Sequence, residues 1–214
     1  MAERKRPRRT RERILETALG LFNRFGEPNV TTADIANEME ISPGNLYYHF
    51  RNKDQIIAEL FGAFERRLAP LLTQPEGRAP DIEDLWLLLH LLFEAEWEHR
   101  FFFRDLDEIV SRDRKLAARF ARLMRNGSHT VIELCRGMVT TGTMHASQRE
   151  IAALADNVTL VATYWISYQN ITGDPGRTET SLDRAAYQVL SLIAPFLRGN
   201  QRALLDRLGR DYLQ

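Results

Sequence analysis

The apolar residues of this chain recur every three or four positions, which is the repeat of one face of an α-helix. Over residues 9–25, Ile14, Ala18 and Phe22 fall on one such face, and Gly26 stands where a left-handed helix cap is expected. No stretch shows sustained alternation of apolar and polar residues, so the predicted fold class is all-α. Further helices are predicted to begin at Thr31 and to cover 43–50, 53–72, 81–98, 101–110, 113–141, 148–171, 181–198 and 201–212.

Short polar residues mark several of these helix starts. Ser42 is a good N-cap, and Pro43 follows it at the first helical position, where a missing N–H costs nothing. Three pairs have the spacing of a capping box, in which two side chains cap each other's backbone N–H groups. These pairs are Thr31 with Asp34, Asn52 with Gln55, and Ser147 with Glu150.

Composition narrows the class of protein. The 214 residues carry no net charge, but residues 1–13 hold seven basic and two acidic side chains, which is typical of a solvated tail or a nucleic-acid arm. The single cysteine, Cys135, permits no intrachain disulfide and fits a reducing cytoplasm. The charged N-terminus does not resemble a signal peptide, and the apolar run 85–93 is too short to span a bilayer. We therefore expect a cytoplasmic protein with no membrane partner.

Residues 31–53 have the features of a helix-turn-helix: one helix, a tight turn, and a short second helix with polar residues near its start. Leu46 and Phe50 are predicted to anchor the second helix in a core. The alternative is that the neighbouring aromatic residues also pack that core, but adjacent tyrosines and a histidine cannot all face one side of a helix. The polar side chains that could hold a DNA backbone are Thr32, Asn45, Tyr47, Tyr48, His49 and Lys53.

With these motifs in place, residues 9–56 resemble the DNA-binding domain of the TetR (tetracycline repressor) family of bacterial transcriptional regulators. The resemblance rests on Ile14-Leu15, Leu21-Phe22, Phe25-Gly26, Thr31-Thr32, Ile35-Ala36, the run 42–50 and Asn52-Lys53. Glu40 departs from it, since a small residue is common at that position. By position, the family's DNA contacts correspond to Thr32, Pro43, Gly44, Asn45, Tyr47, Tyr48, His49 and Lys53. Of these, Asn45 is the candidate for a base contact, because an amide can pair bidentately with adenine.

The resemblance implies two domains: a basic tail and helix-turn-helix over 1–54, and a helical effector-binding and dimerisation domain over 55–214. It implies a homodimer, most often a repressor, that binds a palindromic double-stranded DNA operator and is released by a small effector. Aromatic residues of the second domain would suit a lipophilic effector. On the predicted helix 81–98, four aromatic or histidine residues share a face that either packs the core or lines the effector pocket. The pocket candidates are Trp86, His90, Phe93, Trp97, Phe101, Phe102, Arg104, His129 and Trp165.

The two predicted helices 148–171 and 181–198 resemble the pair that forms the dimer interface in this family. Both have broad apolar faces, of which one part is expected to serve the subunit core and another part the partner. The candidates for the dimer interface are Val158, Ala162, Trp165, Ala186, Val189, Leu190 and Ile193.

Three other functions are weighed against this interpretation. An enzyme is not predicted, because the chain has no Gly-rich phosphate loop, no Ser-centred glycine elbow and no His-Glu-x-x-His motif. His90 and Glu94 could place two metal ligands on one helix face but lack a third, so no metal or cofactor is expected. A nonspecific architectural DNA-binding protein remains an alternative, although it would not need the large apolar second domain. Redox sensing by Cys135 is the third, with an inert buried thiol as the favoured reading.

Overall fold

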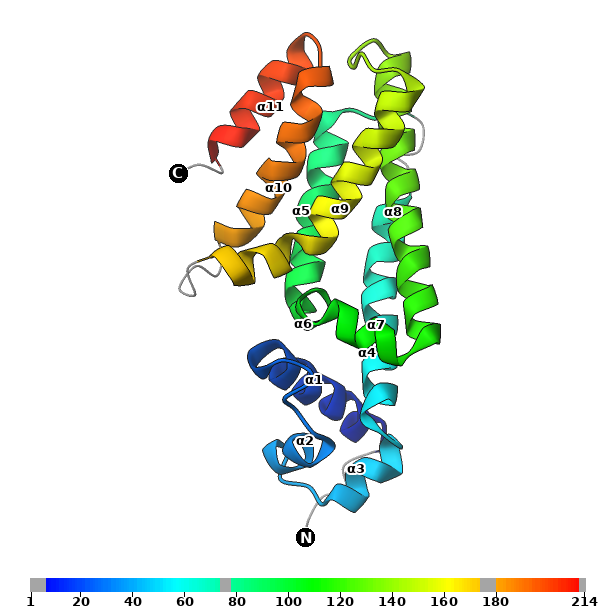
Figure 1. Cartoon of the computed structure of the whole chain (residues 1–214), viewed down its shortest axis with the longest axis vertical. Helices are drawn as coiled ribbons and strands as arrows, with labels where there is room; N and C mark the ends of the chain where they lie inside the picture. The colour runs from blue at the N-terminus through cyan, green and yellow to red at the C-terminus, as the bar shows by residue number, and fades with distance from the viewer. Residues whose placement is uncertain (1–6, 74–77, 174–179, 212–214) are drawn as a thin grey trace. The chain divides into compact units, whose positions relative to one another are not determined.

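The computed structural model describes residues 7–73, 78–173 and 180–211, and within these ranges the chain is helical, which confirms the predicted fold class (Figure 1). Residues 1–6 of the basic tail lie outside this part. The helices are α1 Pro7–Phe25, α2 Thr32–Glu38, α3 Pro43–His49, α4 Lys53–Leu68, α5 Ile82–Glu98, α6 Arg100–Arg104, α7 Leu106–Arg112, α8 Arg114–Thr140, α9 Gln148–Thr172, α10 Thr180–Ile193 and α11 Asn200–Asp211.

The predicted helix boundaries differ from the structure where proline or a local break intervenes. The predicted helix 101–110 is two short helices, α6 and α7, which meet at Asp105. The helices predicted to reach 72 and 198 end earlier, because Pro70 and Pro195 lack the N–H that continues an α-helix. The chain there continues as the 3₁₀ segments η1 Ala69–Leu72 and η2 Ala194–Phe196.

The predicted caps are largely confirmed. Thr31 and Ser147 each form a complete capping box with the acidic residue three positions on, and Ser42 accepts from the backbone N–H of Asn45. Asn52 accepts from Gln55 N, but the Gln55 side chain returns to Arg51 N and not to Asn52. Gly26 ends α1 in the left-handed conformation, with φ 91°, and its N–H donates to Phe22 O.

One compact unit comprises residues 1–66 together with 98–117, so α6 and α7 pack with the N-terminal helices. α1 contacts both α2 and α6. Aromatic rings form much of the core: Phe22 lies 5.2 Å from Phe101, and Phe102 lies 5.3 Å from Phe61, measured between ring centroids. The other wholly buried residues of this core are Ile14, Ala18, Ile35, Ala36, Leu46, Phe50, Ile56 and Phe64.

A second compact unit comprises residues 67–97 and 118–214. α9 and α10 lie side by side in it (Figure 1), and their inner faces share one core with α5 and α8. An isolated antiparallel bridge between Met144 and Leu197 joins the segment before α9 to the segment after η2. No helix in the described part of the chain combines the length and the apolar character needed to cross a bilayer.

These packing units do not coincide with the two domains predicted from sequence. The first division lies within α4, between Arg66 and Arg67, whereas the predicted boundary falls between residues 54 and 55. The larger difference concerns residues 98–117, which were predicted to belong to the effector domain but pack with the DNA-binding helices. The predicted boundary thus remains a prediction about domains, and the contacts define the two units.

Glu96 is an unusual member of the inner face of α5. It is 3 % exposed, it follows Leu85, Leu89 and Phe93 along the buried stripe, and its Oε2 has no hydrogen-bond partner. Burial alone raises the pKa of this carboxyl well above its ordinary value. Because the folded protein binds this proton more tightly than the unfolded chain does, the contribution of Glu96 to stability falls as pH rises above the ordinary value of 4.5.

We predict that Glu96→Met raises the free energy of unfolding at pH 7 by about 1–3 kcal/mol, because a buried polar group without a partner is removed. The gain should shrink as the pH is lowered through 4.5 and below, where the carboxyl becomes protonated in the unfolded chain as well as in the folded protein. Urea denaturation at several pH values measures both effects. Glu83→Met, the same change at an exposed position of α5, is the control and should give no gain. Equal or lower stability of Glu96→Met at pH 7 would contradict the prediction.

Candidate nucleic-acid interface

α2, α3 and the turn between them form the helix-turn-helix that the sequence predicts. Leu46 and Phe50 hold α3 against the core, and both are wholly buried. The turn is closed by a hydrogen bond from Ile41 N to Ala36 O at 3.0 Å. Glu40 occupies this turn with φ 53°, a left-handed conformation that favours glycine, so this departure from the family pattern stands at a strained position.

The outer face of α3 is polar and aromatic. Pro43, Gly44 and Asn45 are exposed at its N-terminal end, and the side chains of Tyr47 and Tyr48 are 52 % and 78 % exposed. This exposure excludes the alternative in which both tyrosines pack the core. The short helix therefore presents hydroxyl, amide and backbone N–H groups, the donors that contact phosphates and base edges.

Several contacts fix the orientation of this face. Tyr47 Oη lies 3.1 Å from Thr32 Oγ1, so a hydrogen bond joins α3 to the first residue of α2. The Tyr48 and His49 rings meet edge to face. Arg11 of α1 donates to His49 O at the end of α3, stacks over the Phe50 ring at 4.2 Å and pairs with Glu59 of α4. The recognition surface is thus braced from two sides.

Gly44 has no reason within the chain to be a glycine. Its φ is not positive, and an added Cβ would meet only Ser42 Oγ, at 4.0 Å. Alanine would also favour the helix by more than glycine does. A glycine at an exposed helix start, with space around it, is consistent with close approach of another molecule to the backbone.

Lys53 is the one predicted DNA contact whose charged group points to the protein. Its Nζ donates to Glu27 O at 2.9 Å and to Val30 O at 3.0 Å. It also lies 2.8 Å from Glu27 Oε1, although that oxygen accepts no hydrogen bond of good geometry, so this contact is mainly ionic. The Glu27 carboxylate is wholly buried, and its Oε2 accepts from Arg112 at 2.6 Å.

The sequence did not predict a role for Arg11, Glu27 and Arg112, whose contacts hold the helix-turn-helix in place. No local pattern marks them, because their partners lie 38 or more residues away in the chain for Arg11 and 85 residues apart for Glu27 and Arg112. A charged residue between Gly26 and Pro28 would be assigned to an exposed loop from sequence alone. Glu27 is instead among the most deeply buried side chains.

The predicted pocket residues are divided between the two units. Phe101, Phe102 and Arg104 belong to the first unit, where the two rings pack its core and Arg104 donates to Phe22 O at 2.7 Å. The remaining candidates belong to the second unit: Trp86, His90, Phe93, Trp97, His129 and Trp165. Of these, Phe93 is buried in the core and His129 is exposed, whereas the Trp86 ring stacks on His90 and its buried Nε1 has no hydrogen-bond partner.

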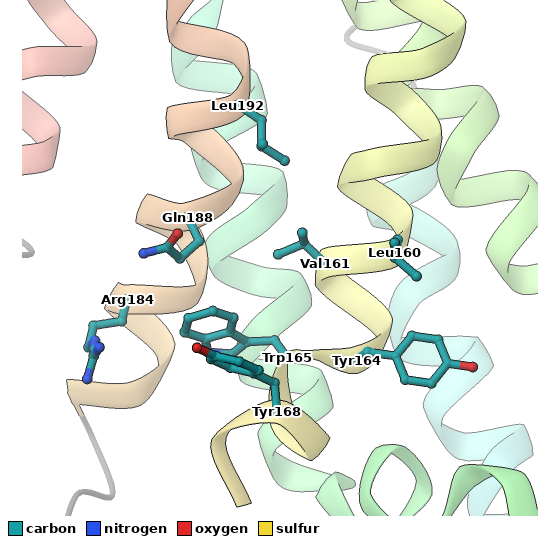
Figure 2. Close-up of a pocket in the computed structure, with 8 residues that line it drawn as sticks. All are labelled: Leu160, Val161, Tyr164, Trp165, Tyr168, Arg184, Gln188 and Leu192. Carbon is teal, nitrogen blue, oxygen red and sulfur yellow. The ribbon is translucent and has the colours of Figure 1, made fainter. Parts of the chain in front are cut away.

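Most predicted dimer-interface residues face the core of their own unit, so a partner could not reach them in this conformation. The inward-facing residues are Val158, Ala162, Ala186, Val189, Leu190 and Ile193, and Trp165 is half-buried. The outward faces of α9 and α10 instead line an open groove of about 380 Å³ (Figure 2). Its lining residues are Leu160, Val161, Tyr164, Trp165, Tyr168, Arg184, Gln188 and Leu192.

Two remaining candidate chemistries are weak in this structure. His90 Nε2 lies 3.6 Å from Glu94 Oε1, but among the described residues no three His, Cys, Asp or Glu side chains gather as metal ligands. Cys135 is wholly buried, and burial raises the pKa of its thiol to about 11. At neutral pH this thiol is protonated, which disfavours the reactive thiolate that redox sensing needs.

Comparison with known proteins agrees with this geometry. The family model described as "Bacterial regulatory proteins, tetR family" matches residues 14–60, and the one described as "Bacterial transcriptional repressor" matches residues 63–205. The crystal structure of a TetR-family transcriptional regulator from Marinobacter aquaeolei VT8 is 34% identical, with 95% of this chain and 98% of that chain covered and a TM-score of 0.87.

Curated relatives match over shorter stretches. The probable acrEF/envCD operon repressor of Escherichia coli (strain K12) is 36% identical over 53 residues, which cover 25% of this chain and 24% of the relative. The uncharacterized HTH-type transcriptional regulator YvkB of Bacillus subtilis (strain 168) is 32% identical over 110 residues, covering 50% of this chain and 53% of the relative. The chain thus aligns with about a quarter of the first relative and about half of the second.

Proposed function

Because the chain belongs to the TetR family of bacterial transcriptional regulators, we propose that it represses transcription by binding a palindromic DNA operator as a homodimer. We further propose that a small lipophilic effector releases it from the operator. Regulators of this family are not enzymes, and many are repressors with small-molecule effectors. The observation that carries the proposal is the exposed polar and aromatic face of α3, held rigidly by Leu46 and Phe50 beneath it.

The proposed DNA contacts divide by chemistry. The hydroxyls of Thr32, Tyr47 and Tyr48, the His49 ring and the backbone at Pro43–Gly44 hold phosphates, which sets affinity and orientation for every sequence. Asn45 reads a base edge at the exposed N-terminal end of α3, where recognition helices of this type contact the major groove. Lys53 belongs to this set by position, but its internal contacts give it a separate role, which is developed below.

The proposed dimer interface is the outward surface of α9 and α10, not the inward residues predicted from sequence. Leu160, Tyr164 and Tyr168 are 58 %, 40 % and 56 % exposed, which is high for large apolar side chains so close together. Figure 2 shows Tyr168 beside Trp165 on the side of α9 that faces Arg184 and Gln188 of α10, and Tyr164 pointing away from α10. Two such faces brought together would bury these rings and set the spacing of the two recognition helices.

The proposed effector site lies along α5 in the second unit. Trp86 and His90 stack on its surface, and the helix carries two buried polar atoms without hydrogen-bond partners, Trp86 Nε1 and Glu96 Oε2. Such atoms are costly in the free protein, and a ligand with complementary polar groups would satisfy them. Effector binding would then stabilise a dimer whose recognition helices no longer fit successive major grooves.

Binding to DNA is tested first on fragments from the region upstream of its own gene. We expect a salt-sensitive specific complex in a gel-shift assay, with Asn45→Ala changing which operator variant binds most tightly and Tyr47→Phe weakening all variants alike. Unchanged sequence preference in Asn45→Ala would show that Asn45 makes no base contact. Absence of any specific complex across the panel would contradict the proposed function itself.

Gly44→Ala separates DNA approach from folding. We expect unchanged or slightly higher thermal stability, since the added methyl makes only an ordinary contact with Ser42 Oγ at 4.0 Å and alanine favours the helix. Operator affinity should nevertheless fall by about tenfold or more, equivalent to about 1.4 kcal/mol. Gly20→Ala, at an exposed position of α1 where a Cβ meets no atom within 4 Å, is the matched control and should keep wild-type affinity. Equal affinity of the two variants would exclude close backbone contact at Gly44.

Leu160→Asp tests the dimer surface. Because Leu160 is 58 % exposed within one chain, the substitution should leave the fold intact, yet it would place a charge in the proposed apolar interface. Analytical ultracentrifugation is expected to show a dimer for the wild type and a monomer for the variant. Leu87→Asp, on α5 and 49 % exposed, is the control and should remain dimeric. A dimeric Leu160→Asp would place the interface elsewhere.

A further inference from the structure

We propose that Lys53 is a positioning residue: with Glu27 and Arg112 it holds the recognition helix in its binding orientation, and it does not neutralise a DNA phosphate. This inference rests on the proposed DNA-binding function and deepens it. It also opposes the role that Lys53 has by position in the family pattern. The three charged groups all lie within the first unit.

The contacts of the Lys53 ammonium leave little for a phosphate. An ammonium has three N–H donors. Two donate to the backbone oxygens of Glu27 and Val30, and Glu27 Oε1 lies 2.8 Å from the same ammonium in an ionic contact. The side chain is only 21 % exposed, so the aliphatic part is also packed. A phosphate would have to compete with protein oxygens that already hold the charge.

The place of these contacts in the chain explains what they fix. Val30 immediately precedes Thr31, the N-cap of α2, and Lys53 is the first residue of α4. The bond from Lys53 to Val30 O therefore joins two residues that lie 23 positions apart, with α2, the turn and α3 between them. This hydrogen bond closes the segment and so restricts how α3 can tilt on the core.

The buried charge of Glu27 requires that the Lys53 ammonium stays in place. Its carboxylate is wholly buried, and a buried charge is tolerated only when it is paired. Lys53 supplies one cation, and Arg112 at the end of α7 supplies the other, at 2.6 Å from Oε2. The Glu27 N–H donates to Asp105 Oδ2 at 2.8 Å, so the same loop is also bound to the junction of α6 and α7.

The two roles of Lys53 predict opposite effects of Glu27→Gln. If Lys53 neutralised a phosphate, loss of the competing carboxylate would free the ammonium and leave affinity equal or higher. If Lys53 positions α3, the same change weakens the contacts that hold Lys53 in place. The fraction of protein with α3 in the binding orientation then falls. The apparent affinity equals the intrinsic affinity multiplied by that fraction, so it falls by the same factor at every salt concentration.

The salt dependence gives a second, independent distinction. The slope of log K against log salt is negative, and loss of one phosphate contact reduces its magnitude by about 0.9, because one fewer counterion is released. Loss of a positioning contact shifts the line to lower affinity and leaves its slope unchanged. The experiment measures operator affinity of the full chain by fluorescence anisotropy at several salt concentrations for the wild type, K53M, E27Q and R112M. Circular dichroism at the same temperature verifies that each variant is folded.

We expect K53M and E27Q to weaken binding by about tenfold or more, with lines parallel to that of the wild type, and R112M to weaken it in the same manner although Arg112 lies outside the predicted DNA contacts. A flatter line for K53M by about one unit, or wild-type or tighter binding by E27Q, would overturn the inference. If K53M does not fold, wild-type or tighter binding by E27Q is still sufficient to overturn it. Failure of the wild type to bind any operator would instead contradict the proposed function.

Discussion

A single buried carboxylate organises the N-terminal unit. Glu27 lies in the short segment between α1 and α2, wholly removed from solvent, and two cations from distant parts of the chain approach its two oxygens. If the start of α4 or the end of α7 moved away, this buried charge would lose one of its two cations. Arg104 also donates to the carbonyl groups of Phe22 and Asn23 near the end of α1, so further polar contacts join α6 to α1.

The consequence for DNA recognition is rigidity where it matters. α3 has only seven residues and would not be stable as an isolated helix. Its orientation is set by its cap at Ser42, by the two buried anchors beneath it, and by Arg11 and Lys53 at its flanks. A surface that is already ordered loses little conformational entropy when it binds, so its contacts can serve affinity and discrimination.

Local signals allowed much of this structure to be predicted, whereas long-range pairing could not be. Ser42–Pro43, Gly26 and the Ser147–Glu150 pair act within a few residues, and each was found where the sequence places it. The role of Lys53 depends on Glu27, and the helix pattern around either residue contains no trace of the other. α9 shows the same limit in another form: it is apolar on more than one face, so Val158 and Leu160 look equally suited to a core or an interface, and only tertiary packing separates them.

The unit that carries the helix-turn-helix is discontinuous in the chain, since residues 98–117 complete it after an intervening segment that belongs to the other unit. During synthesis, Glu27 is made long before Arg112, and the aromatic core around Phe22 waits for Phe101 and Phe102. The unit that carries the helix-turn-helix therefore reaches its final packing only after more than half of the protein has left the ribosome. For the same reason, a hybrid regulator joined to another effector domain within α4 would inherit α3 without the helices that brace it, and the exchangeable part has to include α6 and α7.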